Sequence, residues 1–172
     1  MTYMKILQTR RHVLGLIGAA IGGAALAACG GGSSSSAPAG AANAPAAGSG
    51  GAVALEISSV GEESKYDKEK LEAAAGSKIT LKFNNKSTGS KLFNWVLTQP
   101  GKFLLVVNDG ATEGEASGYL KPNDPNTIAH TKLLKAGESD TITFDAPPPG
   151  EYPYVCTTPG YYAIMKGALV IK

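Results

Sequence analysis

Cys156 and Met165 are the residues whose types and spacing most clearly suggest chemistry. They open and nearly close the segment CTTPGYYAIMKG, residues 156–167. A thiolate and a thioether are soft donors that suit cuprous copper. Tyr161 between them could add a phenolate, although its ordinary pKa of about 10 makes ionisation costly near neutral pH. The Pro-Gly pair indicates a turn. The segment therefore predicts a loop that carries two soft donors.

The other cysteine, Cys29, belongs to a different part of the chain. Lys5, Arg10 and Arg11 precede an apolar run from Val13 to Ala28, which is too short and too rich in Ala and Gly for a membrane span. Residues 1–28 are therefore predicted to be an export signal. Within it, TRRHVLG (9–15) resembles a twin-arginine export motif, and LAAC (26–29) resembles the lipobox of bacterial lipoproteins. The alternative is an ordinary signal with a chance cysteine.

The segment after Cys29 predicts a tether. Residues 30–51 consist of Gly, Ser, Ala, Pro and Asn, so they cannot bury enough apolar surface to fold. As a flexible coil they would span about 25 Å. We expect residues 29–51 to form a lipidated cysteine with a flexible Gly/Ser/Ala linker. The expected location is the bacterial cell envelope, at its periplasmic or extracellular face, with a membrane as partner through the lipid on Cys29.

Charge and cysteine counts limit the function classes. Of 16 Lys and Arg residues, three lie in residues 1–28, which leaves 13 basic residues against 14 acidic ones. No arginine remains after Arg11, so a nucleic-acid partner is not expected. A lipidated Cys29 would leave Cys156 as the last free thiol, with no internal disulfide possible. Only His130 follows the signal, so acid-base catalysis has little to use, and an enzyme is not expected.

Residues 52–172 predict an all-β domain. Apolar residues alternate at period two in several short segments that turn signals separate. The expected strands are 53–57, 78–83, 141–144, 151–156 and 168–172. Short strands at this spacing favour a sandwich of two antiparallel sheets. Residues 99–122 predict a partly helical flap, and the mixed-charge residues 62–70 are interpreted as solvated.

Several motifs in the same order resemble one known family. FNWVLT (93–98), YLKPND, IAHTKLLKAGESDTITFDAP and CTTPGYYAIMKGALVIK are similar to segments of the cupredoxins, the type 1 blue copper family, and within them of azurin and the auracyanins. The resemblance covers nearly all of residues 53–172. It implies a cupredoxin-type Greek-key β-sandwich. It also implies that Trp95 lies in the core and that His130 is not a ligand.

The resemblance also implies a ligand set, which this chain matches only in part. In the family, copper lies between two imidazoles and a thiolate, with a weak axial thioether. Cys156 matches the thiolate and Met165 the thioether. The two imidazole positions fall on Phe93 and Tyr161, so both histidines are replaced.

Two further positions match residues that support the metal in the family. Asn94 corresponds to the residue whose amide steadies the cysteine strand. Leu92 would supply the carbonyl near the opposite axial position.

The leading interpretation is a non-enzymatic interaction module that needs no cofactor and whose usual copper site is lost or strongly altered. Phe93 would fill the place of an imidazole with apolar surface, and Tyr161 would cover it. A second interpretation is a copper-binding electron-transfer protein or a Cu(I) carrier that uses Cys156 and Met165, with a redox protein as partner. A third is a thiol redox sensor at Cys156.

Overall fold

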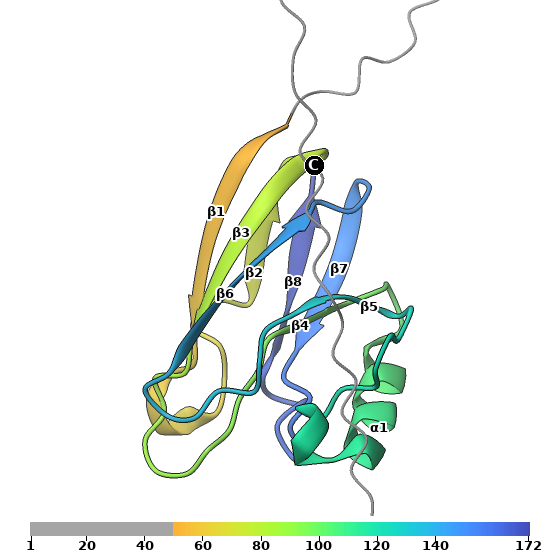
Figure 1. Cartoon of the computed structure of the whole chain (residues 1–172). Helices are drawn as coiled ribbons and strands as arrows, with labels where there is room; N and C mark the ends of the chain where they lie inside the picture. Colours follow the sequence, from red (N-terminus) through yellow and green to blue (C-terminus); the bar gives the residue numbers. More distant parts are fainter. Residues whose placement is uncertain (1–49) are drawn as a thin grey trace, which may run out of the picture. The chain divides into compact units, whose positions relative to one another are not determined.

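The computed structural model describes residues 50–172. The predicted signal (1–28), the predicted lipidation site at Cys29 and nearly all of the predicted linker lie outside the described residues. Within residues 50–172, no helix has the length and hydrophobicity needed to span a bilayer. The described part is a β-sandwich with one α-helix at its side (Figure 1).

Two sheets form the layers of the sandwich. One has three strands in the order β1-β3-β6, and the other has five in the order β2-β8-β7-β4-β5. The first sheet contains β1 (Gly50–Ser58), β3 (Ser77–Asn84) and β6 (Ser139–Asp145). The second contains β2 (Lys70–Ala73), β4 (Val96–Thr98), β5 (Thr127–His130), β7 (Gly150–Val155) and β8 (Lys166–Ile171). The all-β sandwich is therefore confirmed.

The expectation of two antiparallel sheets was wrong in part. β1 pairs with β3 in parallel, and β2 pairs with β8 in parallel, while the other ladders are antiparallel. Period-two patterning tells which face of a strand is buried, but it carries no information about the direction of the neighbouring strand.

Alternating side chains build the core, as the pattern predicts. Along β3 the side chains of Ile79, Leu81 and Phe83 are fully buried, while the residues between them are exposed or half-buried. The facing sheet contributes Tyr154 and Leu169 to the same cluster. Because each sheet turns one apolar face inward, the core lies between the two layers and continues to the end where β7 leads into residues 156–165.

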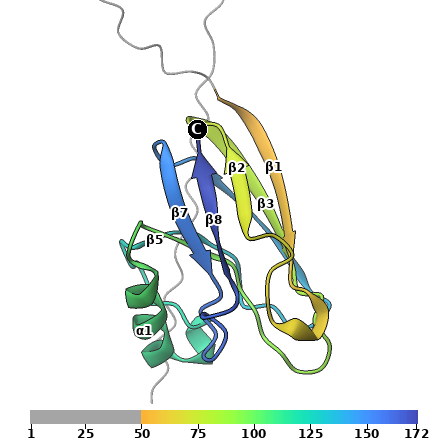
Figure 2. The same ribbon diagram turned by 180° about the vertical axis from the view of Figure 1, so that it is seen from behind.

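The predicted flap at residues 99–122 contains helix α1 (Phe103–Glu113) and the 3-10 turn η2 (Glu115–Ser117). Val106 and Val107 bury one face of α1. Gly110 lies so close to the carbonyl of Tyr119 that a Cβ there would overlap it. α1 ends at Gly114, whose φ of 78° is a conformation that L side chains rarely adopt. Both views show α1 on the opposite side of the molecule from β1 (Figures 1 and 2).

Three strands were not predicted, and four of the five predicted strands are longer than expected. β4 is three residues long and buried on both faces, so it has no alternation to detect. β2 and β5 are only four residues long. β1 begins at Gly50, within the predicted linker, because glycine and alanine extend the ladder to β3 although they give no apolar signal.

Candidate functional site

The predicted loop does bring Cys156 and Met165 together. Cys156 directly follows β7 and Met165 directly precedes β8, and the Cys156 N–H donates to the Met165 carbonyl at 2.9 Å. Between them, Tyr161 N–H donates to Thr158 O at 3.2 Å and Met165 N–H donates to Tyr161 O at 2.8 Å. Both sulfur-bearing side chains are fully buried. The turn therefore places the thiol and the thioether at one end of the core.

Phe93 and Tyr161 form an aromatic pair at this end of the core. Two backbone hydrogen bonds join Phe93 to Leu134. The Phe93 N–H donates to the Leu134 carbonyl at 3.0 Å, and the Leu134 N–H donates to the Phe93 carbonyl at 2.8 Å. Its ring meets that of Tyr161 edge to face, with centroids 5.1 Å apart and planes at 88°. Phe93 is fully buried and Tyr161 half-buried. The pair packs with Cys156 and Met165 in one apolar cluster.

Asn94 ties the strand before β4 to the cysteine loop. Its Nδ2 donates to Thr157 Oγ1 at 2.8 Å and to Gly118 O at 3.0 Å, and its Oδ1 accepts from the Thr157 N–H at 2.9 Å. Asn94 is fully buried, so these bonds satisfy a polar side chain that would otherwise be costly to bury. The amide thus fixes the residue next to Cys156.

The Leu92 carbonyl contacts the loop that follows Cys156. It accepts a hydrogen bond from the Thr158 hydroxyl at 2.9 Å. This bond joins the two segments on either side of the thiol. The hydroxyl of Thr158 and the backbone N–H groups of Asn94 and Thr158 also lie close enough to the Cys156 sulfur to favour a thiolate. Since one hydroxyl carries one proton, Thr158 can donate to Leu92 or to the sulfur, but not to both.

Burial is the larger influence on the Cys156 thiol. It raises the pKa of Cys156 above its ordinary value, and the surrounding hydrogen-bond donors offset that effect only in part. A thiol reacts as its thiolate, and the sulfur is fully buried, so its reactivity in the folded chain is low. This geometry does not favour the interpretation of Cys156 as a thiol sensor.

Tyr66 is part of the site, although no sequence pattern indicated its role. It lies in the mixed-charge segment 62–70, which was interpreted as solvated, yet it is only 3% exposed. Its hydroxyl donates to the carbonyl of Asn94 at 2.7 Å. Burial raises the pKa of Tyr66 well above its usual range, and the nearby Cys156 and Tyr154 add to the effect. A single aromatic residue among charged ones was the only available signal.

Trp95 occupies the core, as the resemblance implied. It is fully buried and its ring lies against Tyr154, with centroids 5.6 Å apart. Its Nε1 is buried without a hydrogen-bond partner among residues 50–172. The indole therefore packs mainly through ring contacts, which it also makes with Phe144.

His130 lies away from this cluster. It ends β5 opposite Val96 of β4, and Val96 lies opposite Val155 of β7. Two strand spacings, roughly 9–10 Å, thus separate the His130 backbone from the strand that leads to Cys156. The imidazole is exposed, and its Nδ1 lies 3.2 Å from the carbonyl of Thr131.

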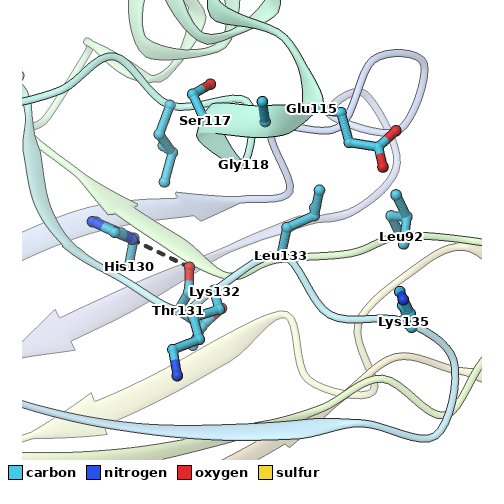
Figure 3. A pocket seen from close by; sticks show the side chains of 11 residues that line it. Leu92, Glu115, Ser117, Gly118, His130, Thr131, Lys132, Leu133 and Lys135 are labelled. Carbon is cyan, nitrogen blue, oxygen red and sulfur yellow. Dashed lines mark hydrogen bonds between the residues drawn. The ribbon is translucent and has the colours of Figure 1, made fainter. Parts of the chain in front are cut away.

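His130 instead borders an open groove beside the site (Figure 3). The groove has a volume of about 420 Å³. Figure 3 shows Leu133 at its centre, Ser117 and Gly118 on one side and His130 at one end. Leu92 and Lys135 line the other end, and a second hollow continues from there.

A family profile described as copper binding proteins, plastocyanin/azurin family, matches residues 53–172. The chain belongs to this family. It is 41% identical to auracyanin-A of Chloroflexus aurantiacus over 124 residues, which are 71% of this chain and 76% of the relative. It is 46% identical to azurin of Pseudomonas aeruginosa over 82 residues, which are 46% of this chain and 55% of the relative.

Solved structures of family members have the same fold. The auracyanin of Roseiflexus castenholzii, in a dithionite-reduced crystal structure, superimposes with a TM-score of 0.67 at 37% identity, over 70% of this chain and 97% of that one. Auracyanin A of C. aurantiacus, described as a "blue" copper protein, gives the same TM-score and identity over 70% and 99%. The cupredoxin fold that the resemblance implied is confirmed.

The donors that this chain places at the site can be compared with the needs of a type 1 copper centre, which are two imidazoles, a thiolate and a weak axial thioether. The site offers the Cys156 thiol and the Met165 thioether. Phe93 has no lone pair, and His130 lies two strands away. Within residues 50–172 no group of three or more His, Cys, Asp or Glu side chains is placed to hold a metal. The donor set does not fit a type 1 centre.

Proposed function

We propose that this chain is an azurin- and auracyanin-like cupredoxin whose type 1 copper site is lost or strongly altered, and that it acts as a non-enzymatic interaction module. The observation that carries the proposal is the edge-to-face pair of Phe93 and Tyr161 beside the buried Cys156 and Met165. The pair fills with apolar rings the two positions that match the imidazoles of the family.

The interaction surface in this proposal surrounds the aromatic pair. Tyr162 is 37% exposed and Ile164 is 58% exposed, and both lie in the loop that holds Tyr161. Apolar side chains exposed next to a rigid, packed loop can dock against another protein at little cost in conformational entropy. The partner in this proposal is therefore a protein that buries the loop between Cys156 and Met165.

Location is the second part of the proposal. The signal at residues 1–28, the lipobox cysteine and the linker to residue 51 support an exported chain that is held at a membrane of the cell envelope. Mass analysis of the mature N-terminus checks this part. A chain that begins elsewhere than at a lipid-modified Cys29 would contradict it.

The main proposal is tested by restoring the two imidazoles. The intact chain and its Phe93→His/Tyr161→His variant are loaded with Cu(II) and with Cu(I), desalted, and analysed for metal content and visible absorption. We expect only the double variant to hold one copper and turn blue, because only it combines two imidazoles with the thiolate. The two single variants are matched controls with one imidazole each. A blue charge-transfer band in the parent chain would contradict the proposal.

A second candidate function is a Cu(I) carrier or a copper electron-transfer protein that uses Cys156 and Met165. One observation favours it: Cys156 and Met165, the two soft donors, are both fully buried and lie in one cluster at the same end of the core. Thiolates bind soft metals strongly. In this case the parent chain retains one Cu(I) after desalting, and Cys156→Ser lowers its affinity at least about 100-fold. If Cys156→Ser binds Cu(I) as the parent does, this candidate fails.

A further inference from the structure

Along the outer edge of β1, the backbone N–H and C=O groups of one half are covered by side chains, and those of the other half are not covered by any described residue. Near the end of the strand, the Ser58 N–H donates to Asp67 Oδ1 at 2.9 Å and the Glu56 carbonyl accepts from Lys68 Nζ at 2.7 Å. These groups therefore face away from β3. The side-chain carboxylate and ammonium group cover this half of the edge, as charged groups commonly do at the margin of a sheet.

The other half of the edge has no such cover among the described residues. Backbone groups alternate in direction along a strand, so Ala52 and Ala54 also direct their N–H and C=O groups away from β3, while Val53 and Leu55 bond to it. Ala52 and Ala54 are exposed, and within residues 50–172 no atom lies within 4 Å of where a Cβ of Gly51 would be. Within residues 50–172 the sheet ends at β1, and no hydrogen bond to these outward groups is found.

We propose that this half-edge is a pairing site for a second copy of the same chain, which adds its own β1 in antiparallel orientation about a two-fold axis at Val53. Ala52 then lies opposite Ala54 of the second copy, and Ala54 opposite its Ala52. Each copy supplies two N–H and two C=O groups at the spacing that an antiparallel ladder needs. All four outward donors are then satisfied in pairs, which is the self-complementarity that a two-fold interface requires.

The side chains along this half-edge also fit a copy of themselves. Two pairs of methyl groups meet across the junction, so no bulky or charged side chain separates the two strands there. Glu56 is the nearest acidic residue on β1, and in this register it falls opposite Gly50, so like charges do not face each other. Pairing over so few residues gives a small interface and a weak dimer.

The pairing leaves the candidate functional site open. β1 begins at the end of the sandwich that holds the C-terminus, and the loop between β7 and β8 lies at the opposite end (Figures 1 and 2). The two functions can therefore be tested separately.

The first test removes one outward N–H from each copy. Ala54→Pro takes away a donor that makes no bond to β3, and proline is tolerated at an edge position whose N–H faces solvent. Sedimentation equilibrium is measured on the intact chain in nonionic detergent over a series of concentrations. We expect the parent to form dimers, and Ala54→Pro to raise the dimer Kd about 30-fold, because two hydrogen bonds are lost per dimer.

Thr143→Pro on the other edge of the same sheet is the matched control. The Thr141 N–H donates to the side chain of the preceding residue, at Asp140 Oδ1, at 3.0 Å, and so it does not bond to β3. Backbone groups alternate in direction along a strand, so the Thr143 N–H, two residues further on, also faces away from β3. This variant should dimerise as the parent does. A parent that stays monomeric at all concentrations, or an Ala54→Pro variant that dimerises like the parent, overturns the proposal.

A cross-linking test fixes the register. Chains that carry Ala52→Cys are mixed with chains that carry Ala54→Cys under mild oxidation, with the parent chain as the blank. Opposed residues in a hydrogen-bonded pair are about 5.5 Å apart at Cα, within the range of a disulfide. The mixed pair should therefore cross-link several-fold faster than either variant alone. Equal rates in the mixture and in the single-variant samples overturn the register.

Discussion

The thiol site and the His130 groove both include Leu92, yet water reaches them very differently. On one side of Leu92 its carbonyl accepts the Thr158 hydroxyl, next to a thiol that is fully buried. On the other side its side chain lines an open groove that His130 borders. The side chains with soft-metal chemistry are thus sealed in apolar surroundings, while the only imidazole in residues 50–172 is solvated.

This contrast shows that donor types alone do not define a metal site in this fold. A cupredoxin centre needs imidazole and thiolate in the same enclosed space. This chain keeps both kinds of side chain after residue 50, but it places them in environments of opposite polarity. We therefore expect the thiol region to respond to mutation through packing, and the groove to respond very little.

The sharpest contrast is between Phe93→Ala and His130→Ala. Removal of a fully buried ring leaves a cavity and should lower the free energy of unfolding by about 3–5 kcal/mol. His130→Ala removes an exposed side chain and should change it by less than about 0.5 kcal/mol. Urea unfolding followed by far-ultraviolet circular dichroism checks both values. Equal losses would show that the two regions are not energetically distinct.

A smaller loss in the free energy of unfolding is expected when the buried polar side chain of Asn94 is removed. Asn94→Ala leaves the Thr157 N–H and the Gly118 carbonyl without their partner, which should cost about 2–3 kcal/mol. Ser117→Ala is the control on the groove side. It removes a half-buried hydroxyl bonded to Gly114 O at 2.7 Å, and should cost no more than about 1 kcal/mol. The same urea experiment measures the pair, and a reversed order would argue against the buried network.

The smallest effect concerns pH. Burial raises the pKa of Cys156, so the folded chain keeps the thiol proton after the unfolded chain begins to lose it near pH 8.5. This contribution is fully present below that value and declines as the pH rises. The free energy of unfolding should therefore fall as the pH rises above that value. Urea unfolding between pH 7.5 and 9.5 should show the decline in the parent and a flatter profile in Cys156→Ala. A decline of equal size in both chains would assign it to other groups.

Much of this contrast could be predicted from local sequence. The loop between Cys156 and Met165 has a turn signal, and the strands of the three-stranded sheet show period-two alternation. The flap was predicted from its length and helix-tolerant residues. In each case a few neighbouring residues determine the structure, so pattern arguments are enough.

Other features depend on residues far apart in the chain. β4 is buried on both faces by elements that come later in the sequence, and so it shows no alternation. Tyr66 is drawn into the core by its bond to Asn94, 28 positions away, although its neighbours are charged. The bond from Thr158 to the Leu92 carbonyl spans 66 positions. Such pairings arise from tertiary packing, which local propensity does not encode.

Trp95, whose indole nitrogen has no hydrogen bond within residues 50–172, can serve as an intrinsic fluorescence probe of the core. Trp95 is the only tryptophan in the chain, and its Nε1 is buried with no hydrogen bond among residues 50–172. An indole that is buried in a protein core emits at shorter wavelength than one in contact with water. Because the ring shares a core with Cys156 and Phe93, any event that admits water to the thiol shifts this emission to the red. The opening of the site can therefore be followed in real time without a label.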